Sequence, residues 1–165
     1  MWILAIDPGD TESGICLMDG YKPWKADKLS NDDTLKIIDT YSTWADAVVI
    51  EMVASYGMAV GKSVFDTCVW IGRFWEAFRQ HTNFRKSVEL IYRMEEKMAI
   101  CHDSRAKDTN IRQALIDRFA EFDKKTGKGT KKKPDWFYGF SKDAWMAYAV
   151  GVTFLDKKRE EITRR

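Results

Sequence analysis

The sequence predicts an α/β fold in which helices cover both faces of a five-stranded mixed sheet. Residues 2–6 and 47–50 are short apolar runs of the kind that is buried on both faces of a sheet. The Asp19-Gly20 pair indicates a hairpin between two further strand-like segments. Segments with the apolar pattern of helices alternate with the later strands. Together these features predict an α/β layered sandwich.

The first half of the chain supplies four of the predicted strands. In order, the expected elements are strands over 2–6, 14–18 and 21–28, a short helix, and a strand over 47–50. Asn31-Asp32-Asp33 is expected to cap the helix, because short polar side chains accept bonds from its first N–H groups. Leu35, Ile38 and Tyr41 then form one apolar side of that helix.

The second half is expected to be mainly helical. Its elements are a loop over 54–61, a helix over 62–80, a strand over 88–92, a helix over 109–122 with Asp108 as N-cap, a lysine-rich linker over 123–140, and a helix over 141–160. The linker contains glycines, so we expect it to be mobile. No repeat or boundary interrupts the chain, and residues 1–165 are expected to form a single domain.

Composition limits the classes of function. The net charge is only +2, so no bulk attraction to nucleic acid is evident, although six of the ten residues 124–133 are lysine. The three cysteines form no CxxC pair, which favours free thiols in a reducing compartment over a disulfide framework or a zinc site. No stretch is long and apolar enough for a membrane span, and no signal peptide precedes the first strand. An intracellular, cytoplasmic protein is therefore expected.

Three carboxylates occupy positions that a rigid scaffold could bring together. Asp7 and Glu51 each end a buried strand, and Asp143 stands at the start of the last helix. Taken singly, each has an ordinary alternative: a turn aspartate, a surface glutamate at a strand end, and an aspartate in the first turn of a helix. As a cluster they would repel one another unless a hard cation held them, and oxygen ligands suit Mg²⁺ or Mn²⁺.

The order of these motifs resembles that of the RuvC-type Holliday-junction resolvases. The similar stretches are Ile3-Leu4-Ala5-Ile6-Asp7-Pro8-Gly9 with Gly14, Val48-Val49-Ile50-Glu51, Ser104-Arg105-Ala106-Lys107, and Asp143 before Ala147-Tyr148-Ala149-Val150. The "KDAWMAYAVGV" ending looks nearest to the phage-encoded branch, which would place the protein in the host cytoplasm. The resemblance implies an RNase H-like fold, a homodimer and metal-dependent nicking of four-way DNA junctions. It also implies that Asp7, Glu51 and Asp143 are catalytic metal ligands.

One feature departs from the family pattern. Bacterial members usually have two acidic residues spaced D-x-x-D before the alanine-rich helix. If Asp143 is the first of the pair, Met146 takes the place of the second; if Asp143 is the second, Phe140 takes the place of the first. Either alignment lacks one acidic ligand. Asp135, Asp66 and Asp103 are candidate substitutes, and the sequence does not choose among them.

Basic and aromatic residues around this site suggest contacts with DNA. Lys107 resembles a family lysine that stabilises charge on the reacting phosphate, although a solvated loop lysine is the plain alternative. Tyr56 and Met58 fall where family members insert a wedge into the junction, and an aromatic ring there could stack on an unpaired base. The expected backbone contacts, which would be salt-dependent, are Lys62, Arg105, Lys131, Lys132 and Lys133.

The remaining aromatic and histidine residues favour other roles. Phe65, Phe74, Trp75 and Phe78 are expected in the core and at a dimer interface, because the 62–80 helix is apolar over more than one face. The last helix could instead cover that second face. His81 and His102 lack the spacing of metal ligands and are expected at the surface.

Four functions remain in view. The first is a crossover junction endodeoxyribonuclease that hydrolyses phosphodiester bonds in branched DNA with Mg²⁺ or Mn²⁺. The second is another RNase H-like nuclease acting on RNA:DNA hybrids or single strands. The third is a junction-binding protein that has lost its chemistry with the missing carboxylate. The fourth, an actin-like ATPase, needs two lobes for which 165 residues are too few.

Overall fold

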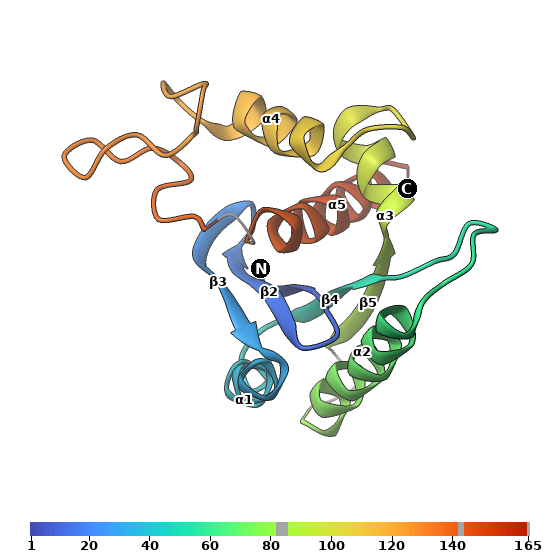
Figure 1. The fold of residues 1–165 in the computed structure, drawn as a ribbon. Coiled ribbons are helices and arrows are strands. Elements are labelled where there is room, and N and C mark those ends of the chain that lie inside the picture. Colours follow the sequence, from blue (N-terminus) through green and yellow to red (C-terminus); the bar gives the residue numbers. More distant parts are fainter. Residues whose placement is uncertain (82–85, 142–143, 165) are drawn as a thin grey trace.

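The computed structural model describes residues 1–81, 86–141 and 144–164 (Figure 1). The elements are β1 (Trp2–Asp7), β2 (Glu12–Asp19), β3 (Lys22–Ser30), α1 (Asn31–Ser42), β4 (Ala47–Met52), α2 (Lys62–Gln80), β5 (Ser87–Tyr92), α3 (Arg93–Glu96), the π-helix η1 (Lys97–Cys101), α4 (Asp108–Phe119) and α5 (Ala144–Thr163). The strands form one sheet in the order β3-β2-β1-β4-β5. β1, β2 and β3 are antiparallel, whereas β1, β4 and β5 are parallel. The predicted mixed, five-stranded α/β fold is confirmed.

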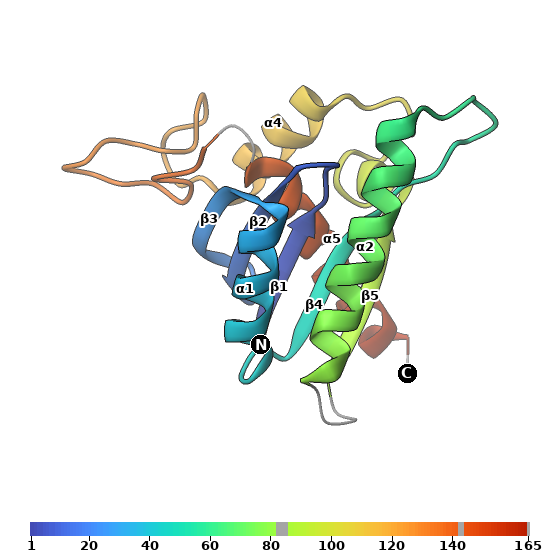
Figure 2. The same cartoon turned by 60° about the horizontal axis from the view of Figure 1, so that its bottom comes forward.

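The central strands are buried on both faces, because helices lie on each side of the sheet (Figure 2). Alternate residues of β1 point to opposite faces. Leu4 and Ile6 pack with α1 and α2, whereas Ile3 and Ala5 pack with α4 and α5. Since α2 and α5 belong to different faces, α5 does not cover the outer side of α2. Within the described ranges, no helix has both the length and the apolar character needed to cross a lipid bilayer.

The cap of α1 differs from the prediction. Ser30, not the following Asn-Asp-Asp run, is the N-cap, and its Oγ accepts a hydrogen bond from the backbone N–H of Asp33 at 3.1 Å. Asn31 is buried, and its Nδ2 donates to the carbonyl of Gly9 at 3.0 Å. Asn31 therefore holds the turn after β1, and Ser30 supplies the acceptor for a backbone N–H group in the first turn of α1.

Two further boundaries were wrong. Asp108 is the first residue of α4 and Lys107 is its N-cap, and the helix ends at Phe119 rather than at residue 122. Residues 93–101, to which the sequence analysis assigned no element, form α3 and η1. Here the backbone of Tyr92 donates to Glu95 Oε2 at 2.7 Å, which closes the first turn of α3. Glutamates in this first turn also complement the positive end of the helix.

The lysine-rich segment 121–140, whose residues 123–140 are predicted as a mobile linker, is a loop with extensive hydrogen bonds to its backbone. Asp135 is buried, and its carboxylate accepts the backbone N–H groups of Glu121, Phe122, Asp123 and Trp136 at 2.7–3.1 Å. The Asp123 carboxylate accepts four more, from Lys125, Thr126, Lys128 and Gly129. Gly129 is required because its φ is +65° and a Cβ would overlap the Lys133 carbonyl. In this loop, two carboxylates accept the hydrogen bonds that backbone N–H groups would otherwise donate to carbonyls within a helix or sheet.

Asp135→Asn should loosen this loop, because an amide offers one acceptor oxygen where the carboxylate offers two. We expect several-fold faster hydrogen exchange at the amides of residues 121–123 and a lower Tm. Burial opposes the charge, but the backbone N–H groups hold the pKa of Asp135 well below its ordinary range. Its stabilisation is therefore complete above about pH 4 and disappears as the pH falls further. Glu121→Gln is the control, and equal exchange rates in the two variants would contradict the assignment.

Helix α5 packs closely on the middle of the sheet at Gly151. A Cβ at this position would overlap the Met18 Sδ and lie 3.2 Å from the Cβ of Ala5. The contact sets how far the start of α5 lies from the end of β1, which is where the candidate site lies.

Gly151→Ala should therefore destabilise the protein by about 1–3 kcal/mol, the usual cost of overpacking a core. Gly72 in α2 is a matched control, because a Cβ there meets nothing within 4 Å. Gly72→Ala should be neutral or stabilising by up to about 1 kcal/mol, since alanine is the better helix former. Chemical denaturation of both variants measures the difference, and equal free energies of unfolding would contradict the packing argument.

Candidate active site

The ends of two parallel strands bring Asp7 and Glu51 together. Asp7 is the last residue of β1, and Glu51 is the fifth of six residues in β4. The register of the two strands pairs Ile6 with Ile50, so the next residue on each strand is one of the two acids. They lie side by side at one edge of the sheet. The third predicted acid, Asp143, lies outside the described residues.

The carboxyl group of Glu51 is in an environment that disfavours its charge. Its side chain is only 15% exposed. Burial raises the pKa of Glu51 to about 10, and the negative charges of Glu96 and Asp7 add to the shift. A side-chain hydrogen bond joins Glu51 to Asp7. Burial and these neighbours therefore favour the uncharged form of Glu51 in the protein without bound cations.

A third carboxyl group approaches from the next parallel strand. Glu96 belongs to α3, which directly follows β5, and its side chain is completely buried. Burial raises the pKa of Glu96 to about 8, with Arg93 acting in the opposite direction and Asp7 in the same direction. Acidic side chains from β1, β4 and the end of β5 thus form a row along one sheet edge.

Arg93 is the cation in this row. Its Nη1 donates to Glu96 Oε2 at 2.7 Å and lies 3.9 Å from Glu51 Oε2. Its Nη2 contacts the Asp108 carboxylate and the Met146 sulfur. Burial works against the guanidinium charge, but Glu96, Glu51 and Asp108 keep the pKa of Arg93 above its ordinary value.

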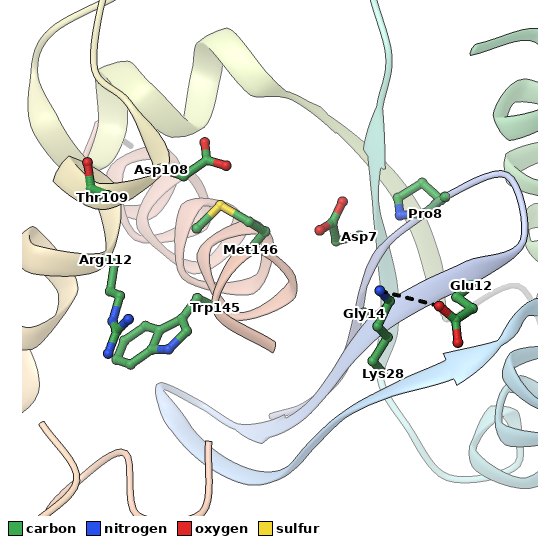
Figure 3. A pocket seen from close by; sticks show the side chains of 11 residues that line it. Asp7, Pro8, Glu12, Gly14, Lys28, Asp108, Thr109, Arg112, Trp145 and Met146 are labelled. Carbon is green, nitrogen blue, oxygen red and sulfur yellow. Dashed lines mark ion pairs between the residues drawn. The ribbon is translucent and has the colours of Figure 1, made fainter. Parts of the chain in front are cut away.

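A cavity of about 360 Å³ opens beside Asp7. Its lining comes from the end of β1, the first strands, the start of α4 and the start of α5, and comprises Asp7, Pro8, Gly9, Glu12, Gly14, Lys28, Asp108, Thr109, Arg112, Trp145 and Met146 (Figure 3). In Figure 3, Asp7, Asp108 and Met146 face the same space. The cavity is thus acidic on the side of Asp7 and Asp108.

Two basic side chains also line the cavity. Lys28 extends from β3, with its Nζ 3.3 Å from Glu12 Oε2. Arg112 lies over the Trp145 ring at 4.9 Å from the ring centroid. Two cations beside a group of carboxylates suit a phosphodiester whose charge must be balanced on both sides.

The turn that follows Asp7 is held by other side chains. Ser13 Oγ accepts the Gly9 N–H at 3.4 Å and donates to Asn31 Oδ1 at 2.6 Å. Asn31 in turn donates to the Gly9 carbonyl. Ser13 of β2 and Asn31 of α1 thus hold the Pro8-Gly9 turn, and Asp7 lines the cavity (Figure 3).

The predicted DNA-contacting residues lie on exposed segments around this edge. Lys107 precedes α4, next to the cavity residues Asp108 and Thr109, but is not itself in the lining. Arg105 is 92% exposed in the same loop. Tyr56, with φ +46°, and Met58 are exposed in the loop before α2, which Lys62 begins. Lys131, Lys132 and Lys133 are exposed in the 121–140 loop.

The loop between β4 and α2 and the 121–140 loop extend from the same end of the molecule, one on either side of the end of β1 (Figure 2). In the aromatic set of α2, Phe74 and Phe78 are buried in the core, Trp75 is half-buried and Phe65 is 61% exposed. His81 and His102 are exposed, as expected.

The candidate substitutes for the missing acid have local partners. Asp135 holds the backbone of its loop, and Asp66 pairs with Lys62 along α2. Asp103 accepts the backbone N–H of Arg105 at 2.9 Å. None of the three lines the cavity beside Asp7.

Sequence reasoning missed Glu96, Arg93, Asp108, Lys28 and Arg112. For Glu96 a signal was present, because the segment 88–92 was already predicted as a strand. If that strand runs parallel to the preceding one, its carboxyl end meets the same sheet edge as Asp7 and Glu51. An acidic residue within one helical turn of that end then becomes a site candidate.

The donor set fits a hard divalent cation, which prefers carboxylate oxygens. Repulsion among Asp7, Glu51 and Glu96 is what a cation would relieve, and Glu96 Oε1 is buried with no hydrogen-bond partner in the described part of the chain. Within residues 1–81, 86–141 and 144–164, no three acidic, histidine or cysteine side chains already converge at ligand distance.

The fold is similar to that of solved RuvC structures. The Thermus thermophilus RuvC structure aligns with a TM-score of 0.66 and 14% sequence identity, covering 98% of this chain and 97% of that chain. T. thermophilus RuvC in complex with a Holliday junction substrate gives the same TM-score and identity, with 98% and 96% covered. The sequence itself matches no protein-family model and no curated protein. The chain therefore has the RuvC-like, RNase H-like fold that its motif order predicted.

Proposed function

We propose that this protein is a divalent-metal-dependent endonuclease that nicks branched DNA, with four-way junctions as its principal substrate. The observation that supports this most is the juxtaposition of Asp7 and Glu51 at the ends of adjacent parallel strands, beside a cavity that Lys28 and Arg112 also line. The similar T. thermophilus RuvC has been solved with a Holliday junction substrate, which favours the same class of substrate here.

In this proposal Asp7, Glu51 and Asp143 hold the cation, which is Mg²⁺ or Mn²⁺. When bound, the cation supplies an acidified water and Lewis-acid stabilisation of phosphate charge. Asp7 orients the attacking water on one side of the phosphodiester. Lys28 and Arg112 neutralise the non-bridging oxygens, and Lys107 adds positive charge at the edge of the cavity. Hydrolysis then leaves a 5′-phosphate and a 3′-hydroxyl.

In this proposal, the exposed segments around the cavity supply affinity for DNA. Arg105, Lys62 and the three lysines at 131–133 contact backbone phosphates, which positions the duplex arms without reading sequence. Tyr56, held at a positive φ at the tip of its loop, stacks on an unpaired base at the crossover. We place the whole of this activity in residues 1–165 as one domain.

We propose further that the protein acts as a homodimer through α2, so that two sites nick opposing strands. Phe65 and Val69 are 61% and 62% exposed on α2, although both are apolar. Val69→Glu should weaken self-association at least about tenfold, because a charge would be buried without a partner. Light scattering after size exclusion measures this. Trp24→Glu, at an aromatic on β3 that is 72% exposed, is the control and should leave the mass unchanged.

The function is tested with labelled four-way junction, linear duplex and RNA:DNA hybrid, each with Mg²⁺, Mn²⁺ or EDTA. Paired, symmetric nicks on the junction with either metal, and none in EDTA, are the expected result. Cleavage of the hybrid alone would replace the proposal with a ribonuclease H activity. Cleavage of the junction, the duplex and the hybrid alike would instead show a non-selective nuclease.

One observation favours a second candidate, a junction-binding protein without cleavage. Met146 lines the cavity where one alignment with the resolvase family expects a carboxylate, and its sulfur contacts Arg93. If position 146 were indispensable for holding metal, chemistry would be lost while binding remained. Tight, metal-independent binding of the junction without nicks would establish this candidate instead.

A further inference from the structure

Arg93 lies inside the acidic cluster rather than at its edge. The guanidinium is 20% exposed and pairs with the completely buried Glu96. It also approaches Glu51 and contacts Asp108, so it joins acids from β4, α3 and α4. Ion pairs of this i,i+3 kind on exposed helix surfaces contribute little. Here a single guanidinium balances several carboxylates at a site that also fits a divalent cation.

Glu96 is only half-satisfied by this pairing. Its Oε2 accepts from Arg93 at 2.7 Å, whereas its Oε1 is buried with no hydrogen-bond partner among the described residues. Leaving a buried carboxylate oxygen unpaired is costly, and an arginine fork can satisfy both oxygens of a carboxylate when the geometry is built for it. The second oxygen of Glu96 is therefore available for a ligand that the guanidinium does not replace.

The position of Glu96 matches that role. β1, β4 and β5 are consecutive parallel neighbours in the sheet, and Asp7, Glu51 and Glu96 lie at or just beyond their carboxyl ends. Arg93 Nη1 stands between Glu51 and Glu96, at 3.9 Å from the first and 2.7 Å from the second. Removing the guanidinium would leave these carboxylates facing each other with space for another cation between them.

We propose that Glu96 is a further ligand of the divalent cation, supplied from α3 in the absence of a carboxylate at position 146, and that the cation displaces Arg93 from these acids. This inference rests on the proposed metal site of Asp7 and Glu51. The displaced guanidinium remains at the site edge through Asp108, where it is available to a phosphate.

Binding of Mn²⁺ to the protein without DNA tests the proposal. Titration calorimetry and Mn²⁺ electron paramagnetic resonance both report affinity without any nicking assay. Glu96→Gln should weaken Mn²⁺ binding about tenfold or more. Glu95→Gln is the matched control, because Glu95 is the adjacent residue of α3 and pairs with Lys157 instead. The affinity of Glu95→Gln for Mn²⁺ should equal that of the unaltered protein.

Arg93→Met should tighten Mn²⁺ binding, by at least roughly tenfold, because it removes a competing positive charge from within a few ångströms of the site. Arg93→Gln serves the same purpose if the methionine variant does not fold, as judged by circular dichroism. If Arg93 only held the carboxylates in place, its loss would disorder them and weaken Mn²⁺ binding.

The outcomes separate this inference from the proposed function. Unchanged affinity in Glu96→Gln, or unchanged or weaker affinity in the Arg93 variants, overturns the inference. Asp7→Asn should abolish Mn²⁺ binding in the same assay. Unchanged affinity in Asp7→Asn, or no binding to the unaltered protein, overturns the proposed metal site itself.

Discussion

Asp7→Asn should reduce junction nicking by at least about 10³-fold, because in the proposed function this carboxylate both holds the cation and orients the water. Junction binding should persist, since Asp7 contributes negative charge and no contact that attracts DNA. Asparagine is isosteric and can keep the hydrogen bond to Glu51. The loss would therefore be chemical, not structural. Single-turnover nicking and a gel-shift titration at fixed salt measure the two quantities separately.

The matched control for this experiment is Asp10→Asn. Asp10 is exposed in the turn that follows β1, three positions from Asp7, and lies outside the cavity lining. The control should nick at the unaltered rate. Residual nicking in Asp7→Asn within about tenfold of the unaltered protein would rule out a central role for this carboxylate.

Glu51→Gln should have two large effects of opposite sign. Nicking should be lost, since an amide is a poor ligand for a hard cation. In EDTA, however, the variant should be more stable than the unaltered protein at neutral pH, by about 1–3 kcal/mol. The gain follows because the uncharged glutamine avoids the cost of burying a charge beside other acids, which raises the pKa of Glu51 to about 10.

The pH dependence gives the sign of this effect. A carboxyl group whose pKa is higher in the folded protein destabilises it above the pKa of the unfolded chain, which is about 4.3 for glutamate. The metal-free protein should therefore lose stability as the pH rises from about 4.3 toward 10, and Glu51→Gln should show a shallower loss. Urea denaturation in EDTA at pH 5, 7 and 9 measures both slopes. Parallel slopes would show that Glu51 is ionised in the folded protein.

Hydrophobic pattern was enough to predict the sheet. The runs 3–6 and 47–50 contain no polar residue, which is a property of central strands and of few other segments. The Asp-Gly pair at 19–20 identified the hairpin, in which Asp19 pairs with Lys22 and Gly20 takes the positive φ, +53°, in the turn between them. These are local signals, so no knowledge of distant contacts was required.

The acids at 7 and 51 were predictable for a related reason, since strand ends are fixed points of the fold. Glu96 and Arg93 were not, because their roles depend on which strand lies beside β4. That neighbour relation is a property of the whole sheet. The order of the 121–140 loop also depends on distant pairing, because Asp135 binds backbone groups 12 to 14 residues earlier in the chain. Composition alone makes such a segment look like a linker.

The same loop has a consequence for how substrate choice and catalysis are divided in the sequence. Its shape is set by Asp123 and Asp135 near its base, whereas the lysines at 131–133 occupy a short turn closed by the bond from the Thr130 N–H to the Lys133 carbonyl. The tip can therefore exchange residues, lengthen or change charge while the base keeps its geometry and the acids at 7, 51 and 96 stay in place. We therefore expect substitutions at residues 131–133 to change the charge of this tip without moving the acids at 7, 51 and 96.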